Sequence, residues 1–113
     1  MVVCGTEQVS PECIKITSDA GLAFFIRKSY LKIVKIQEIV SGAEFFEEAE
    51  KDIVDAGLVM AVESKAMEYL ARAEQSRFGL TRKLILKNFS KEHIEIALDY
   101  LEAKNYLSDE RFA

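Results

Sequence analysis

A short phrase made of lysine, asparagine, an aromatic residue and then a serine occurs twice near the C-terminal end of the sequence. It occupies residues 87–90 and recurs, with one leucine inserted, at 104–108. Asparagine tolerates the left-handed conformation that closes a helix, and a serine side chain accepts a hydrogen bond from an unpaired N–H group where a helix begins. Ser76 is placed in the same way, so the spacing predicts helices over 62–75, 77–87 and 91–104, and a further helix starting at 109.

The three complete helices are joined by short connections, which suits compact packing of one helix on the next. Apolar residues recur in them every three or four positions, as one face of a helix requires. The predicted core of this three-helix unit consists of Leu80, Leu84, Ile94, Ala97, Leu98 and Leu101.

The first 60 residues give weaker signals. Residues 13–27 alternate in polarity on both sides of a turn-forming stretch at 18–21, which predicts a β-hairpin. An isolated hairpin is marginally stable, so its Leu22, Phe24 and Ile26 side chains must pack on another element.

Two helical stretches are expected after the hairpin. Residues 30–40 are ambiguous: we expect a short helix capped by Ser29, although the β-branched content also suits a strand. From Glu44 the helical rhythm is clear, and Gly57 either breaks this run into two helices or weakens a single long one.

These patterns predict a mainly α chain, with a three-helix, helix-turn-helix-like unit at residues 62–104 preceded by a small N-terminal β-hairpin and helical region. The expected division is 1–60 for the N-terminal region, 61–107 for the three-helix unit, and 108–113 for the start of a second unit. A chain of 113 residues has room for one domain or for two small lobes.

The charge is unevenly distributed. The net charge is −4, and residues 1–60 carry six basic and ten acidic side chains, whereas residues 61–113 carry nine of each. Residues 77–91 contain five basic side chains and no acidic one, and a local field of this kind matters more to a partner than the total charge. The candidate residues for contact with a partner or with DNA are Arg77, Arg82, Lys83, Lys87 and Lys91.

Other chemistry has little support in the sequence. Cys4 and Cys13 have no zinc-type spacing and suggest reduced thiols, and His93 is the only histidine. We therefore expect no catalysis, no metal and no cofactor. The sequence shows no signal peptide and no apolar run long enough to span a bilayer, so we expect a cytoplasmic protein without membrane contact.

The stretch from residue 61 to the end contains Ser76-Arg77, Lys83-Leu84 and Arg111-Phe112-Ala113 in that order. With these residues it resembles the first three-helix unit of the RecX family, the regulators of the RecA recombinase. The family pattern runs Ser-Arg-x-Glu-Leu-x-x-Lys-Leu, then Lys-Gly-aromatic, then Gly-aromatic-Leu-Asp-Asp-x-Arg-Phe-Ala. The chain departs from it at Gly79, which stands in place of the glutamate, and at Asn88 and Asn105, which replace the two glycines. The matching residues are Ser76, Arg77, Leu80, Lys83, Leu84, Lys87, Phe89, Leu98, Leu101, Tyr106, Leu107, Asp109, Arg111, Phe112 and Ala113.

The resemblance implies a role. RecX proteins bind in the groove of the RecA–DNA filament and restrain the recombinase during DNA recombination, DNA repair and the SOS response, and they are not enzymes. The family usually has three such units, so we expect this chain to be a fragment that restrains RecA weakly. We also expect weak non-specific DNA contact, and weak self-association through Phe112.

A second class of function stays open, namely a stand-alone tri-helical DNA-binding domain of helix-turn-helix type. A helix that reads bases needs Arg, Asn or Gln at its exposed N-terminal positions. The stretch from residue 91 presents Lys91, Glu92, His93 and Glu95 instead, which disfavours sequence-specific reading.

Overall fold

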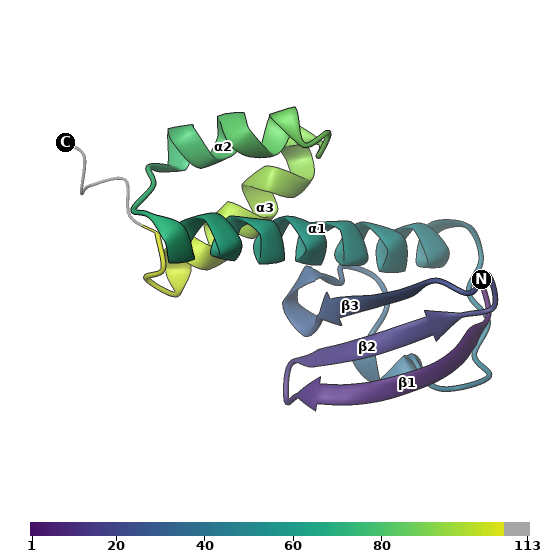
Figure 1. The fold of residues 1–113 in the computed structure, drawn as a ribbon. Helices are drawn as coiled ribbons and strands as arrows, with labels where there is room; N and C mark the ends of the chain where they lie inside the picture. Colours follow the sequence, from purple (N-terminus) through teal and green to yellow (C-terminus); the bar gives the residue numbers. More distant parts are fainter. Residues whose placement is uncertain (108–113) are drawn as a thin grey trace. The chain divides into compact units, whose positions relative to one another are not determined.

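The computed structural model describes residues 1–107, and it divides the chain into two compact units, Met1–Met60 and the part that begins at Ala61 (Figure 1). The predicted start of a second repeat at 108–113 lies outside the described residues. Helix α1 (Glu47–Arg72) is continuous, so residues 47–60 belong to the first unit and 61–72 to the second. Gly57 therefore does not divide the run into two helices.

The first unit is built on a three-stranded antiparallel sheet in the order β1-β2-β3 (Figure 1). Its strands are β1 (Val3–Ser10), β2 (Cys13–Ser18) and β3 (Ala23–Arg27). The predicted hairpin is confirmed as β2 and β3, with Ile14 opposite Ile26 in the register. The turn between them places Gly21 at φ +81°, a conformation that glycine adopts without steric cost.

The inner face of the sheet and the first half of α1 share one apolar core. Ile16 and Ile26 from the sheet are fully buried, as are Ile53 and Ala56 from α1. Leu22, which the alternation placed on this face, precedes β3 and is 64% exposed. The packing is close at Gly57, where a Cβ atom would lie 2.7 Å from Cδ2 of Phe24.

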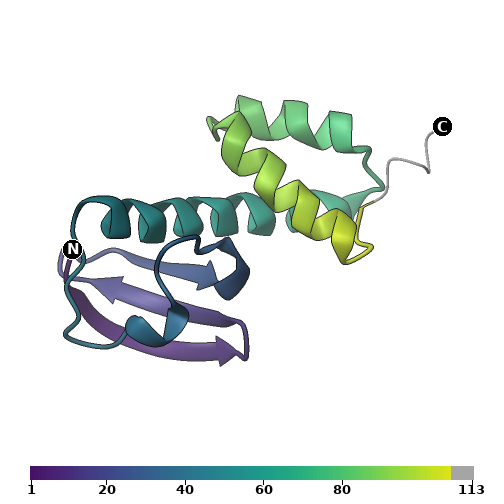
Figure 2. The ribbon, with the colours of Figure 1, turned by 180° about the vertical axis from the view of Figure 1, so that it is seen from behind.

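The expected short helix at residues 30–40 is wrong. The segment contains only two 3-10 turns, η1 (Lys28–Tyr30) and η2 (Ile36–Glu38), and residues 32–34 between them form a bend. The buried Asp52 of α1 holds this bend, because its carboxylate accepts hydrogen bonds from the backbone N–H groups of residues 32–34. Farther on, residues 42–44 pair with the start of β1 (Figure 2).

The second unit consists of the end of α1 followed by α2 (Arg77–Leu86) and α3 (Lys91–Ala103). The predicted starts of α2 and α3 are confirmed, because Ser76 Oγ accepts from Gly79 N at 3.0 Å and Ser90 Oγ accepts from His93 N at 3.2 Å. The helix predicted at 62–75 is instead the second part of α1, which ends at Arg72. The predicted core is confirmed as well, since its six residues are at most 1% exposed: Leu80, Leu84, Ile94, Ala97, Leu98 and Leu101.

Both predicted asparagine terminators are confirmed. Asn88 has φ +69° and Asn105 has φ +65°, so each adopts the left-handed conformation after a helix. Each is followed by the pair of backbone hydrogen bonds of a Schellman motif, for example Asn88 N to Ile85 O at 2.9 Å and Phe89 N to Leu84 O at 3.4 Å. The fold is therefore mainly helical with an N-terminal β part, and its C-terminal helices begin and end where the local sequence specifies.

Candidate functional site

Arg77 stands at the first position of α2 and is tied to α3 by ion pairs. Its guanidinium lies 2.8 Å from the Asp99 carboxylate, also pairs with Glu102, and donates to the backbone oxygen of Glu95 at 3.4 Å. Burial of the guanidinium lowers its pKa, but the hydrogen bonds and charges of Asp99 and Glu102 outweigh this and raise the pKa above its ordinary value. With a side chain only 21% exposed, Arg77 joins two helices and offers little free charge to a partner.

Arg82 lies one turn farther along α2 and points to solvent beside an exposed aromatic ring. Its guanidinium carbon is 5.8 Å from the centre of the Phe78 ring, within the range of a cation–π contact. Phe78 itself is 71% exposed. A partner that covers this ring would gain from burying its apolar area.

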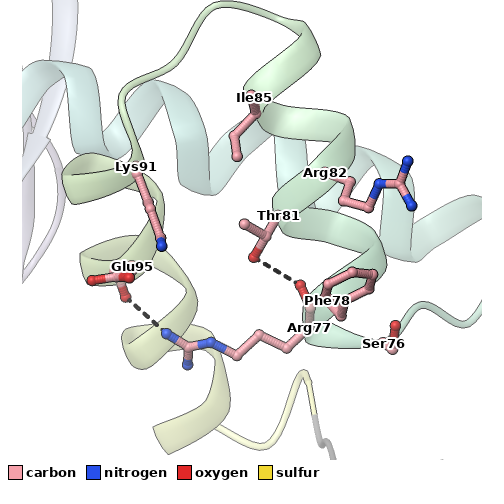
Figure 3. Close-up of a pocket in the computed structure, with 8 residues that line it drawn as sticks. All are labelled: Ser76, Arg77, Phe78, Thr81, Arg82, Ile85, Lys91 and Glu95. Carbon is pink, nitrogen blue, oxygen red and sulfur yellow. Dashed lines mark hydrogen bonds between the residues drawn. The ribbon is translucent and has the colours of Figure 1, made fainter.

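A groove between α2 and α3 contains this pair (Figure 3). The Thr81 hydroxyl donates to the backbone oxygen of Arg77 at 2.9 Å, so it offers no proton to a ligand. The residues that line the groove come from both helices and mix apolar, polar, basic and acidic groups: Ser76 at the N-cap of α2, Arg77, Phe78, Thr81, Arg82 and Ile85 from α2, and Lys91 and Glu95 from α3.

Lys83 does not line this groove and points toward the end of α1. Its Nζ lies 5.3 Å from the centre of the Tyr69 ring and donates to Gln75 Oε1 at 3.1 Å. Lys65 approaches the same ring at 5.6 Å. The ammonium group of Lys83 is therefore held by neutral partners, the Tyr69 ring and Gln75.

Lys87 and Lys91 stand at the connection between α2 and α3, and both are exposed. Lys87 is at the C-terminal end of α2, where the helix dipole favours a cation. Lys91 is the first residue of α3, where the dipole disfavours one. The dipole thus gives a structural reason for Lys87 but none for Lys91.

The five predicted contact residues therefore divide into four environments. Arg77 lines the groove but is neutralised by carboxylates, whereas Arg82 and Lys91 line it without such a pair. Lys83 lies on the Tyr69 side of α2, and Lys87 lies at the end of that helix. Within residues 1–107, Arg82, Lys83, Lys87 and Lys91 have no carboxylate within ion-pair distance. Their assignment to a partner stays a prediction.

Two features of this surface were not found from the sequence. The carboxylates that neutralise Arg77 lie on α3, so the spacing of residues near Arg77 could not predict the ion pairs. The aromatic and apolar exposure of α2 could have been noticed, because Phe78, Ile85 and Leu86 recur at seven and eight residues and so share one helix face.

Neither a metal site nor a membrane span is apparent in the part of the chain that the structure covers. Residues 1–107 contain no group of three His, Cys, Asp or Glu side chains arranged to hold an ion. None of their helices is both long and apolar enough to cross a bilayer.

A long helix followed by two short, capped helices around one core defines a helix-turn-helix-like three-helix unit, and comparison with known proteins shows what this unit is similar to. Residues 64–101 match the model of the RecX first three-helix domain. Regulatory protein RecX from Ralstonia pickettii is 43% identical over 54 residues, which is 48% of this chain and 34% of that protein. RecX from Haemophilus influenzae is 50% identical over 44 residues, which is 39% of this chain and 29% of that protein.

A solved structure shows the same fold over nearly the whole chain. The crystal structure of a regulatory protein RecX aligns with a TM-score of 0.67 and 22% identity, and the alignment covers 98% of this chain and 54% of that one. The chain is thus similar to RecX proteins, and it spans about a third of the length of the curated relatives that it matches.

Proposed function

We propose that this chain is a regulator that modulates the RecA recombinase by inhibiting it, and that it binds the RecA–DNA filament through its three-helix unit. The RecX match at residues 64–101 carries the proposal, because four exposed cations without carboxylate partners lie on or beside that same segment. Such cations fit a partner with a polyanionic surface. The role requires no catalysis and no cofactor, and it belongs in the cytoplasm, where the filament forms.

In this proposal the binding surface consists of Arg82, Lys83, Lys87 and Lys91, with Phe78 as an apolar contact. Arg77 has a different part, since its ion pairs to Asp99 and Glu102 fix α2 against α3. The unit acts in tandem with further three-helix units in a longer protein of this family, so the isolated chain binds more weakly. Weak self-association stays a prediction.

Stand-alone DNA binding is the alternative, and the structure gives reasons against it. Glu92 and Glu95 are exposed in the first turns of α3, where they would repel phosphates. His93 is bound to the cap, with its Nδ1 2.8 Å from Ser90 Oγ. The first turns of α3 thus present neither the side chains nor the charge that a base-reading helix needs.

Co-sedimentation separates the two functions. The chain is centrifuged with RecA assembled on single-stranded DNA, and in parallel with the same DNA alone. The proposal expects the chain in the pellet with filaments and little of it bound to naked DNA. Equal binding to both would favour the DNA-binding alternative, and no binding to filaments would remove the proposal.

A further inference from the structure

A second basic segment lies in the first unit, far along the sequence from the cluster at 77–91. Between Asp19 and Glu38 the chain carries four basic side chains and no acidic one. Three of these, Lys28, Lys32 and Lys35, lie within residues 28–37. Together with apolar residues of the same stretch they line a pocket. This stretch, residues 28–37, is called the lysine segment below.

Hydrogen bonds to two carboxylates hold the backbone of the lysine segment in place. Asp52 Oδ2 accepts the N–H groups of Ile33 and Val34, each at 2.9 Å, and its Oδ1 accepts that of Lys32 at 3.0 Å. Farther along, Glu38 Oε1 accepts the N–H of Lys35 at 2.9 Å. The segment has little regular secondary structure, yet its side chains project from a fixed frame.

The lysine side chains are exposed, and their charge is not neutralised. Within residues 1–107, none of the ammonium groups of Lys28, Lys32 and Lys35 has a carboxylate within ion-pair distance. The two nearby acids are already engaged, because Asp52 and Glu38 accept backbone N–H groups. Three exposed cations on one fixed segment favour an anionic partner.

An aliphatic side chain stands among these lysines. Ile33 is 61% exposed although its own N–H group is anchored to Asp52, so its exposure is imposed by the backbone frame. Leu31 and Ile36 are partly exposed and line the same pocket. A partner that covers this surface therefore gains from burying apolar area as well as from pairing charges.

We propose that the lysine segment is a docking site for an acidic peptide segment that carries an apolar side chain. The carboxylates of such a peptide would pair with Lys28, Lys32 and Lys35, and its apolar side chain would cover Ile33. Nucleic acid fits less well, because the one aromatic residue of the segment, Tyr30, is buried and cannot stack on a base. The N–H groups of residues 32–34 are also used by Asp52 and cannot bind phosphate.

Fluorescence anisotropy with labelled probes tests this proposal, which stands independently of any role toward RecA. The probes are a peptide of about twelve residues that alternates glutamate and leucine, a glutamate–serine peptide of equal length, and an oligothymidylate. The expected order of affinity places the glutamate–leucine peptide first. The variant Lys28→Ala/Lys32→Ala/Lys35→Ala should bind it about tenfold more weakly, since each exposed charge contributes modestly. Ile33→Ser should also weaken it.

Controls keep the result specific. The variant Lys51→Ala/Lys65→Ala/Lys104→Ala removes the same charge elsewhere and should bind the peptide like the unmodified chain. Amide chemical-shift mapping of the unmodified chain should place the peptide at residues 28–36, which requires no variant to fold. Tighter binding of oligothymidylate than of the peptide, unchanged binding by the triple variant, or shifts confined to other residues would each overturn the proposal.

Discussion

Arg77 and Asp99 lie 2.8 Å apart, guanidinium to carboxylate, and join the first residue of α2 to the middle of α3. Glu102 pairs with the same guanidinium from one turn farther along α3. A residue that sequence spacing groups with the partner-binding cations therefore serves mainly to hold the three-helix unit together.

Replacing Arg77 should destabilise the second unit. Arg77→Ala removes a largely buried cation and leaves Asp99 and Glu102 as neighbouring like charges, so the free energy of unfolding should fall by about 1–3 kcal/mol. Arg72→Ala is the matched control, because Arg72 pairs with Glu68 at 3.1 Å but is 69% exposed, and it should cost under about 0.5 kcal/mol. Urea unfolding measures both, and equal losses would contradict the structural role of Arg77.

Asp52 should make the first unit sensitive to acid. Burial raises the pKa of its carboxyl group, but hydrogen bonds from the N–H groups of Val34, Lys32 and Ile33 outweigh this and lower the pKa below the ordinary 3.8. The stabilisation is therefore fully present above about pH 4 and is lost as the pH falls through the lower folded-state pKa.

Asp52→Asn tests this pH dependence. The variant should lower the free energy of unfolding at neutral pH by about 1–3 kcal/mol, because an amide oxygen accepts these bonds more weakly than a carboxylate. Its unfolding free energy should also change less with acid than that of the unmodified chain. Glu7→Gln serves as the control, since Glu7 is exposed on β1 of the same unit. Thermal unfolding at a series of pH values measures the unfolding free energies. If these change with pH in the same way in all three proteins, Asp52 does not anchor residues 32–34.

Gly57→Ala should not give the stabilisation that replacing glycine by alanine usually gives in a helix. Gly→Ala in an open helix interior gains up to about 1 kcal/mol, but here the new Cβ would meet the Phe24 ring. We expect Gly57→Ala to be neutral or destabilising, and to become stabilising when it is combined with Phe24→Leu. Unfolding free energies of the two single variants and the double variant give the coupling. Additive effects would show that the contact is unimportant.

Phe78 should matter for binding and not for stability. Because its ring is 71% exposed, Phe78→Ala should change the free energy of unfolding by less than about 0.5 kcal/mol. Leu84→Ala, at a fully buried position of the same helix, should cost about 2–5 kcal/mol. If Phe78 contacts the filament, its variant should still fold and yet pellet less with RecA–DNA filaments. If the variant pellets with filaments as the unmodified chain does, Phe78 does not contact the filament.

The boundaries of α2 and α3 could be predicted because they depend on neighbours in sequence. Ser76 and Ser90 each bond an N–H three residues ahead, and Asn88 and Asn105 close helices by their own backbone conformation. Because such interactions join residues within about one helical turn, they can be predicted from the sequence without knowledge of the rest of the fold.

The errors have non-local causes. The backbone bend at 32–34 is anchored by Asp52, which lies on α1 some twenty residues away, so the apolar spacing of the segment was misleading. Strand β1 was missed because it is an edge strand whose residues are mostly exposed and do not alternate. The pairing of Arg77 with Asp99 likewise depends on packing between two helices. The candidate binding residues were found from charge alone, which cannot separate a structural cation from an exposed one.

The most direct test of the account is filament co-sedimentation of the variant Arg82→Glu/Lys83→Glu/Lys87→Glu over a range of salt concentrations. We expect binding to fall by at least about tenfold and the slope of log affinity against log salt to decrease by about two, as the loss of three contacts to a polyanion predicts. The control Lys15→Glu/Lys51→Glu/Lys104→Glu carries the same change in net charge and should bind like the unmodified chain. A folded triple variant that pellets with the filament as the unmodified chain does, with the same salt slope, would contradict the account.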